Sequence, residues 1–191
     1  MSTLALASVA AAGAAAGLGS CSGSGTGPGA GSGPGSGGSP AGAGRPLRPP
    51  ARHDGCVTRG ALPDPACTPG AVLTTDLTRI CRPGYTPTVR SVDPALKQRV
   101  YRSYGIGRHL RGAYEIDHLV ALELGGGNDP ANLWPEAASP TPGYHEKDAL
   151  ENHLHDQVCT GRLPLERAQS QIATDWVSAW KSAGQPSGYA S

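Results

Sequence analysis

Residues 22–44 contain almost nothing but glycine, serine, proline and alanine, without a charged or a large apolar side chain. Such a segment cannot bury enough apolar surface to offset the conformational entropy that folding removes. We therefore expect a disordered linker over residues 22–50, one folded domain over residues 51–185 and a disordered tail over residues 186–191. A domain of this length can hold a single modest hydrophobic core.

The first 21 residues have the composition of an export signal. They are uncharged and rich in alanine and leucine, and they are too short and too weakly apolar for a membrane span. The sequence Leu18-Gly19-Ser20-Cys21 resembles the lipobox of bacterial lipoproteins, whose cysteine is lipidated. No lysine or arginine precedes Arg45, so the basic start of a usual signal is missing, and a plain alanine-rich tail is the alternative. We expect export to a bacterial cell surface, with a lipid on Cys21 as the membrane contact.

Cysteine usage agrees with export. Besides Cys21 the chain has four cysteines, which in an exported domain suggest two disulfides, with three conceivable pairings. We favour Cys56–Cys67, which brackets a proline-rich loop, and Cys81–Cys159, which would tie the start of the domain to a late helix. A zinc site is the competing use, but no Cys-x-x-Cys spacing occurs.

The net charge of +1 gives no argument for a nucleic-acid partner, but one segment is locally basic. The stretch from residue 94 to residue 114 carries five cations, no acid and two interleaved tyrosines (Lys97, Arg99, Arg102, Arg108 and Arg111; Tyr101 and Tyr104). A strip of one charge sign can contact phosphates. A solvated helix face is the alternative.

Periodicity and capping residues predict three helices, over residues 94–104, 146–159 and 164–183. Asp93 is a candidate N-cap, and Pro94 suits the first helical position. Leu150, Leu154 and Val158 recur every four residues on one face of the second helix. Residues 53–92 are rich in proline, and we expect loops there, with a short strand or turn near 72–80.

Two strands are expected between the first two helices. Residues 113–124 have the apolar, β-branched character of a strand, interrupted by Asp117-His118, and a glycine-rich turn follows over residues 125–130. A second short strand would run over 132–134 and stop at Pro135. Strands and helices in this order predict an α+β domain.

The segment Tyr114-Glu115-Ile116-Asp117-His118-Leu119 is followed by Asn132 and then by His145 at the start of a helix. In this order the residues resemble the HNH, or His-Me finger, nucleases, and the resemblance extends from Tyr114 to Cys159. It implies a ββα-metal core flanked by further helices. Segments such as Cys81-Arg82-Pro83-Gly84 also resemble exported bacterial proteins that carry the same core.

The chemistry of these residue types fits phosphodiester hydrolysis. The imidazole of His118 titrates near neutral pH, so it can act as a general base. The carboxylate of Asp117 suits a hard cation such as Mg²⁺. Neighbours on a regular strand point to opposite faces, so these two side chains can share a site only where the backbone bends, and we expect such a bend.

The resemblance implies the remaining roles. Asn132 would orient the imidazole or support the metal, and His145 would be the last metal ligand, with Glu151 or Asn152 as alternatives. An aspartate and histidine pair also admits Mn²⁺, Ni²⁺ or Zn²⁺. Three further residues have candidate roles: Glu115 in the metal site if it faces the same side as Asp117, and Lys147 or Arg111 on the scissile phosphate.

The leading hypothesis is an exported, metal-dependent endonuclease that cleaves DNA or RNA with little sequence preference, as a monomer without an obligate protein partner. The main alternative is a non-catalytic surface lipoprotein that uses a degenerate ββα scaffold for binding. Near-neutral charge favours it, because nonspecific nucleases usually have a basic groove. A third reading is a structural zinc module held by Asp117 and His145, which a chelator would unfold.

Overall fold

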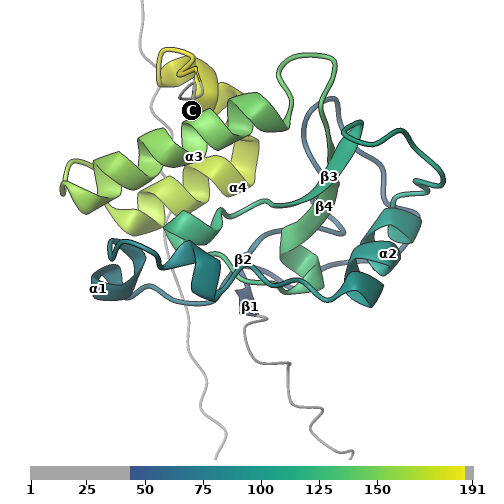
Figure 1. Ribbon diagram of the computed structural model, residues 1–191, viewed down its shortest axis with the longest axis horizontal. Coiled ribbons are helices and arrows are strands. Elements are labelled where there is room, and N and C mark those ends of the chain that lie inside the picture. The colour runs from purple at the N-terminus through teal and green to yellow at the C-terminus, as the bar shows by residue number, and fades with distance from the viewer. Residues whose placement is uncertain (1–43, 188–191) are drawn as a thin grey trace, which may run out of the picture. The chain divides into compact units, whose positions relative to one another are not determined.

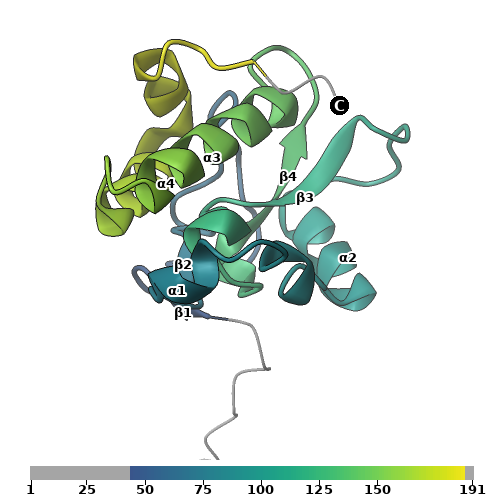
Figure 2. The same ribbon diagram turned by 60° about the vertical axis from the view of Figure 1, so that its left-hand side comes forward.

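The computed structural model describes residues 44–187, which form a mixed α+β domain with two small sheets (Figures 1 and 2). The expected signal segment with Cys21, most of the linker and the last four residues of the tail lie outside the described residues. Within the described part, no helix is long and apolar enough to cross a membrane.

The first sheet joins the start of the described chain to the domain. Strand β1 (Arg45–Pro46) pairs antiparallel with β2 (Ala71–Val72). The N–H of Leu47 continues this contact by donating to the carbonyl of Gly70. The chain therefore packs on the domain from Arg45, six residues before the boundary expected from composition.

The second sheet is the antiparallel hairpin of β3 (Tyr114–His118) and β4 (Leu133–Ala137). Strand β4 runs past Pro135, where the sequence analysis ended it. In a two-stranded sheet each strand has a free edge, and a proline whose nitrogen faces that edge removes no ladder hydrogen bond. Strand β3 is shorter than expected, because the apolar residues after His118 enter the core through the 3₁₀ turn η2 (Leu122–Leu124).

Further helical segments complete the domain besides η2. Counted within the described residues, these are six: α1 (Leu77–Ile80), η1 (Thr86–Thr88), α2 (Pro94–Ser103), η3 (Pro130–Asn132) and the long pair α3 (Tyr144–Cys159) and α4 (Leu165–Ser182). Asp93 caps α2 as expected, since its Oδ1 accepts from the N–H groups of Ala95 and Leu96. The predicted long helices are confirmed to within two residues at each end.

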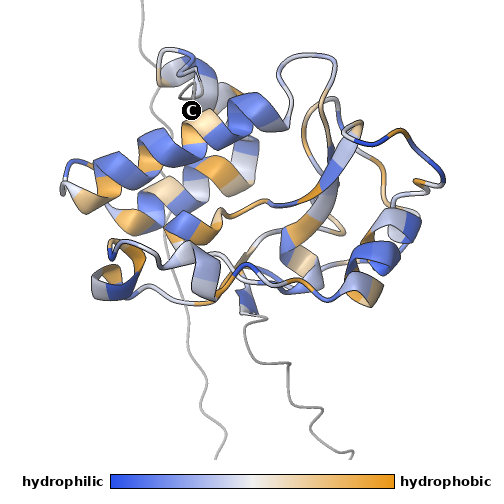
Figure 3. Cartoon of the chain, in the orientation of Figure 1, coloured by the Kyte–Doolittle hydropathy of each residue, from blue (hydrophilic) through white to orange (hydrophobic). Residues whose placement is uncertain are grey.

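Helices α3 and α4 lie side by side, and α2 packs on the β3–β4 hairpin away from them (Figures 1 and 2). Hydrophobic residues recur along α3 and α4, while hydrophilic residues cover most of α2 (Figure 3). The predicted apolar face of α3 is buried in one core with residues of α4, and this core includes Leu150, Leu154, Val158, Ala168, Ile172 and Trp176.

Both favoured disulfides are confirmed. Cys56 is bonded to Cys67, and Cys81 is bonded to Cys159. The second bond joins the residue that follows α1 to the last residue of α3 and spans 78 residues of sequence. It ties the proline-rich first half of the domain to the helical second half.

Candidate functional site

A polar cavity of about 330 Å³ lies beside β3. Its walls come from the segment before α2, from β3, from η2 and from α3, and they combine five carboxyl groups with one imidazole and two cations (Glu115, Asp117, Glu123, Asp148, Glu151; His118; Arg90, Lys97). This concentration of acids distinguishes the cavity from the larger one, of about 570 Å³, which is mostly apolar and has Glu136 as its sole charged lining residue.

Strand β3 supplies the floor of this acidic cavity. Glu115 and Asp117 are two residues apart on the strand and therefore point to the same face, as required for the supporting role considered for Glu115. His118 is the last residue of β3 and lines the same cavity, so the two neighbours share one site at the point where the strand ends.

Asn128 holds the imidazole of His118. The Oδ1 of Asn128 lies 2.8 Å from His118 Nε2, while its Nδ2 donates to the carbonyls of Val89 (2.8 Å) and Ser91 (3.1 Å). Two carbonyls can accept only from the amide nitrogen, which turns the amide oxygen toward the ring. His118 must then donate from Nε2–H, and its proton-free nitrogen is Nδ1.

The surroundings of His118 also favour its neutral form. Burial lowers the pKa of the imidazole, and the nearby Asp117 carboxylate opposes this shift without cancelling it. A neutral ring in a fixed tautomer can accept a proton at Nδ1 near neutral pH. These are the properties of a general base.

Lys147 is a buried cation at the centre of the site. Its Nζ donates to Asp117 Oδ2 (2.5 Å), to the carbonyl of His118 (2.8 Å) and to Glu151 Oε1, so all three ammonium protons are used. Burial disfavours the ammonium form, but the facing carboxyl groups raise the Lys147 pKa well above its usual value. A side chain enclosed in this way is not available to bind a scissile phosphate, which removes the role considered for it in sequence.

One ammonium group faces three carboxyl groups, so they cannot all be ionised. Burial would raise the pKa of Asp117, but Lys147 and the other neighbouring groups together outweigh burial and hold that pKa below its usual value. Burial raises the pKa of Glu136 well above its usual value, and Asp117 adds to the shift. Neither oxygen of Glu136 has a hydrogen-bond partner in the described residues, which a buried neutral acid tolerates better than a carboxylate does.

On the open side of the cavity, the nearby cations do not offset the effects of burial and of the neighbouring carboxylates on the pKa values of the acids. Burial, Asp117 and Asp148 raise the pKa of Glu115 to about 7, although Lys147 and Arg90 act in the opposite direction. At the exposed rim, desolvation and Asp117 raise the pKa of Asp148 to about 6. A cation bound here would favour the ionised form of both groups.

Asn132 is not beside the imidazole. Its Oδ1 accepts from the N–H groups of Ala71 (3.0 Å) and Val120 (2.8 Å), and its Nδ2 donates to the carbonyls of Val120 (3.0 Å) and Gly127 (2.9 Å). The side chain is fully buried and all of its hydrogen bonds go to backbone. It fixes the β3–β4 connection against β2, and the orienting role predicted for it belongs to Asn128.

His145 is at the start of α3, as expected, but it lines a different cavity together with Asn152 and Trp180. Asp148 borders both cavities. Of the ligands considered for the last position, Glu151 is the one that lines the cavity of Asp117 and His118. Asp117 and His145, the pair considered for a structural zinc module, therefore line different cavities.

Part of the basic segment over residues 94–114 lies at the acidic cavity. Lys97 lines it, and Arg99 and Arg102 are exposed on the same helix α2. Tyr104 is instead buried, where its hydroxyl contacts Thr68 (2.6 Å). The exposed cations therefore form the part of the predicted strip that a phosphate could reach.

Sequence reasoning missed the contributions of Asn128, Asp148 and Arg90. Asn128 belongs to the predicted glycine-rich turn. A turn explains the backbone conformation of this residue but does not predict the hydrogen bonds of its side chain. Asp148 could have been found from its spacing. It lies three residues before Glu151 and four before Asn152, so it shares a helix face with two residues already considered as ligands. Arg90 belongs to the proline-rich stretch, in which no regular pattern points to a site.

The chain was compared with protein-family models, with curated proteins and with solved structures, and none of the three comparisons finds a match.

Proposed function

We propose that this domain is a metal-dependent hydrolase of phosphodiester bonds in DNA or RNA. The observation that carries the proposal is the pairing of His118 with Asn128 beside an acidic cavity. The pairing leaves Nδ1 of His118 free to take a proton from water, and the carboxyl groups next to it are the donors that a hard divalent cation prefers.

The donor set fits Mg²⁺ or Mn²⁺ better than a softer ion. Asp117, Glu115 and Asp148 offer oxygen atoms, and no cysteine lines this cavity. We infer that these three residues would hold the metal, with Glu151 beside them. When bound, such an ion neutralises the charge on the phosphate oxygens and stabilises the departing alkoxide.

Other side chains of the domain have supporting roles in the proposed reaction. Asn128 keeps the His118 ring in the productive tautomer, and Lys147 holds the strand end through the carbonyl of His118 and the carboxylate of Asp117. Arg90 and Lys97 line the same cavity and are exposed, so they can attract and position the phosphate backbone.

The order β3, β4, α3 supports the HNH-type ββα-metal reading, because it is the element order that the resemblance requires. Two disulfides are compatible with export, and we retain the signal segment, the lipid on Cys21 and the cell-surface location as parts of the proposal. A monomer that meets nucleic acid outside the cell is the simplest form of this hypothesis.

The direct test is cleavage of plasmid DNA and of RNA by the full chain with Mg²⁺, with Mn²⁺ and with EDTA. We expect cleavage that requires the divalent ion. The change His118→Ala should lower the rate by at least about a hundredfold, the lower end of what a general base contributes. The melting temperature should hardly change, because the ring makes one hydrogen bond in the described chain.

The change His153→Ala is the matched control, since this histidine is also partly buried and lines no described cavity near the acids. Its cleavage rate should equal that of the parent. Equal rates for His118→Ala and the parent would refute the assignment of the base. Absence of cleavage by the parent with every divalent ion would refute the enzyme itself.

A second candidate is a non-catalytic binding domain on a degenerate scaffold. Lys147 favours it, because an internal ammonium already supplies Asp117 and Glu151 with the positive charge that a metal would bring. This candidate predicts neither cleavage nor any effect of Mn²⁺ on the melting temperature. Stabilisation of the parent by Mn²⁺, lost in Asp148→Asn, would count against it.

A further inference from the structure

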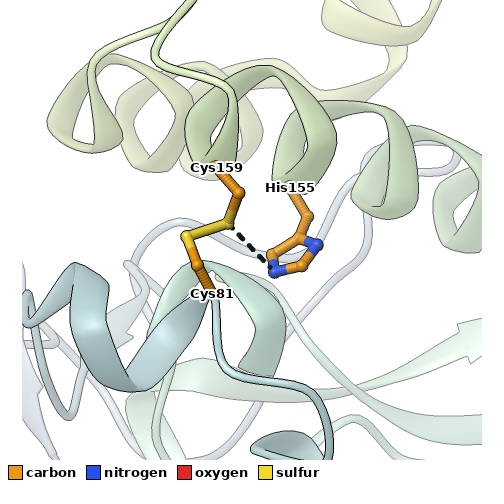
Figure 4. Close-up of side chains that lie close together, drawn as sticks. All are labelled: Cys81, His155 and Cys159. Carbon is orange, nitrogen blue, oxygen red and sulfur yellow. Dashed lines mark hydrogen bonds between the residues drawn. A yellow bond between two sulfur atoms is a disulfide. The ribbon is translucent and has the colours of Figure 1, made fainter.

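A cluster of two sulfur atoms and one imidazole lies at the far end of α3 from the acidic cavity. The side chains of Cys81, His155 and Cys159 meet there, and Figure 4 shows the ring of His155 directed at the disulfide. Their potential ligand atoms all lie within 4.8 Å of one another. Glu151 and Cys159 are eight residues apart on the helix, which separates the two places by roughly 12 Å along the axis.

The local structure explains why these residues meet. His155 and Cys159 are four residues apart on α3 and therefore share a face of the helix. Cys81 follows the last residue of α1, and Nε2 of His155 lies 3.2 Å from the carbonyl of Ile80 and 3.3 Å from Sγ of Cys159. The imidazole thus bridges the end of α1 and the end of α3 beside the sulfur atoms.

The chemistry of this cluster depends on the redox state of its sulfurs. As a disulfide, neither sulfur carries the negative charge that a strong metal bond needs. As thiolates, two cysteines and a histidine are the preferred ligands of Zn²⁺ and of similar borderline cations. Three protein ligands leave a fourth tetrahedral position for water or a small thiol.

We propose that the thiol form of this chain binds a thiophilic divalent cation, such as Zn²⁺, through Cys81, His155 and Cys159. The same three residues then carry either a disulfide or a metal ion, and either one ties α1 to α3. The absence of a Cys-x-x-Cys motif hides this site in the sequence, because one ligand is separated from the other two by more than seventy residues.

Both chemical steps balance with a named reductant. Two molecules of a monothiol reduce the Cys81–Cys159 bond to two thiols and become a disulfide themselves. The cation then displaces one proton from each thiol and binds the two thiolates and the neutral imidazole. Exchange with the disulfide of that monothiol reverses the reaction: the two protein sulfurs form their bond again, two monothiolates leave and the cation is released.

Accessibility supports the exchange step. Cys159 is exposed, and Cys81 and His155 are partly buried, so an attacking thiol can reach the bond from the side of α3. The imidazole of His155 lies within hydrogen-bonding distance of Sγ of Cys159, the exposed sulfur of the pair. The pair Cys56–Cys67 is buried, and the described residues place no histidine ring in hydrogen-bonding distance of it.

The test uses the full chain with Cys21→Ser, reduced by a phosphine under nitrogen and titrated with Co²⁺ as the probe. Thiolate coordination of Co²⁺ gives a charge-transfer band in the near ultraviolet, which carboxylate ligands in the acidic cavity do not produce. We expect this band to saturate at one ion per chain, and we expect Zn²⁺ to displace the Co²⁺. The oxidised chain should give no such band.

Matched variants identify the ligands. Cys81→Ser/Cys159→Ser should lose the band, whereas Cys56→Ser/Cys67→Ser should keep it. His155→Ala should weaken Co²⁺ binding by about tenfold or more, while His153→Ala on the same helix should leave it unchanged. Circular dichroism and melting of each reduced chain with and without Zn²⁺ complete the set.

The outcomes separate cleanly. A rise in the melting temperature of the reduced chain with Zn²⁺, absent from the oxidised chain and from His155→Ala, supports the site even if reduction alone loosens the fold. Equal affinity in His155→Ala and His153→Ala, or a band that survives Cys81→Ser/Cys159→Ser, overturns it. So does a reduced chain, folded or unfolded, that binds no Co²⁺. None of these results depends on the proposed nuclease activity.

Discussion

The nitrogen at which His118 can accept a proton is decided by Asn128, through an amide that the backbone itself orients. The carbonyls of Val89 and Ser91 take both amide protons, so the amide oxygen is left for the ring. A base whose tautomer is fixed in advance does not lose part of its population to the wrong form. The proposed chemistry at His118 therefore depends on Asn128, ten positions later, and on the loop that contains Val89, almost thirty positions earlier.

Asn128→Asp should change the pH dependence of cleavage. The carboxylate would still accept from Nε2–H of His118, but its negative charge stabilises the imidazolium and so raises the pKa of the ring. Because the base must be deprotonated to act, the acidic limb of the pH–rate profile should move to higher pH. The measurement is the rate of plasmid cleavage across pH 5 to 9.

Asn128→Ala is the companion variant, and it should lower the rate at every pH because the ring is no longer held. Asn152→Asp is the control, since that residue lies on α3 in the cavity of His145. A profile for Asn128→Asp that superimposes on that of the parent would show that Asn128 does not act on the base.

Lys147→Met should destabilise the domain by about 3–5 kcal/mol near neutral pH, which is typical of removing one partner from a buried ion pair. The variant leaves Asp117 and Glu151 buried without their cation. In the parent, Lys147 holds the pKa of Asp117 low, and that contribution is present above the unfolded pKa and lost as the pH falls through the folded pKa. The deficit of the variant should therefore shrink on acidification.

Urea unfolding of the two proteins at pH 7 and at about pH 2, which is below the usual pKa of an aspartate, measures this difference. Lys97→Met is the control, because Lys97 is exposed, and its effect should stay within about 0.5 kcal/mol. A deficit for Lys147→Met that is the same at both pH values would contradict the buried ion cluster.

Asp117 and His118 were predicted from sequence because, with an asparagine and a histidine following in order, they resemble the HNH layout. The sequence could not distinguish Asn128 from Asn132. Both amides follow the pair within fourteen residues, and which one meets the imidazole depends on the path of the connection between the strands. The same limit applies to His145, whose place at the start of α3 was predicted but whose direction depends on the rotation of that helix.

Elements with local signals were predicted more accurately than those decided by tertiary contacts. The start of α2 follows from Asp93 and Pro94, and the long helices follow from their apolar repeats. The break in α4 at Asp175 was not expected. There the side chain accepts from the N–H and the hydroxyl of Ser178, and it acts as an internal cap that starts the last part of the helix again.

The glycine-rich turn before Asn128 has a tighter requirement than its sequence suggests. A Cβ at Gly126 would lie 1.8 Å from the carbonyl oxygen of Val120 and 2.8 Å from that of Ala121. The backbone cannot move away easily, because Gly126 also donates to the carbonyl of Ala121 and bridges to Val72. The turn therefore packs backbone on backbone between β2 and η2.

Gly126→Ala should cost about 3 kcal/mol or more, at the upper end of what overpacking usually costs. It should also reduce cleavage, because the turn carries Asn128. Gly107→Ala is the control, since a Cβ there meets nothing within 4 Å. Thermal melting and soluble yield measure both variants, and a Gly126→Ala protein as stable as the parent would mean that this close approach does not exist in solution.

At the scale of the whole molecule, two disulfides could be predicted from the number of cysteines and from export. How much each bond adds to stability depends instead on the length of chain that it closes. Cys56–Cys67 closes 11 residues, within a loop that is already bent by prolines. Cys81–Cys159 closes 78 residues and links the segment that carries Arg90 and α2 to the helix that carries Lys147 and Asp148. The long bond thus links two parts of the chain that both supply residues to the acidic cavity.

Removing the long bond should therefore cost more stability than removing the short one. Loop-closure entropy gives about 4.5 kcal/mol for Cys81→Ser/Cys159→Ser and about 3 kcal/mol for Cys56→Ser/Cys67→Ser. Urea unfolding of the oxidised parent and of both double variants measures the two losses on the same scale. The loss of the long bond should also lower cleavage near the melting transition, since the cavity walls then separate before the core unfolds. If the short bond proved the more costly, strain or residual structure in the unfolded chain, rather than loop length, would control the stability of this domain.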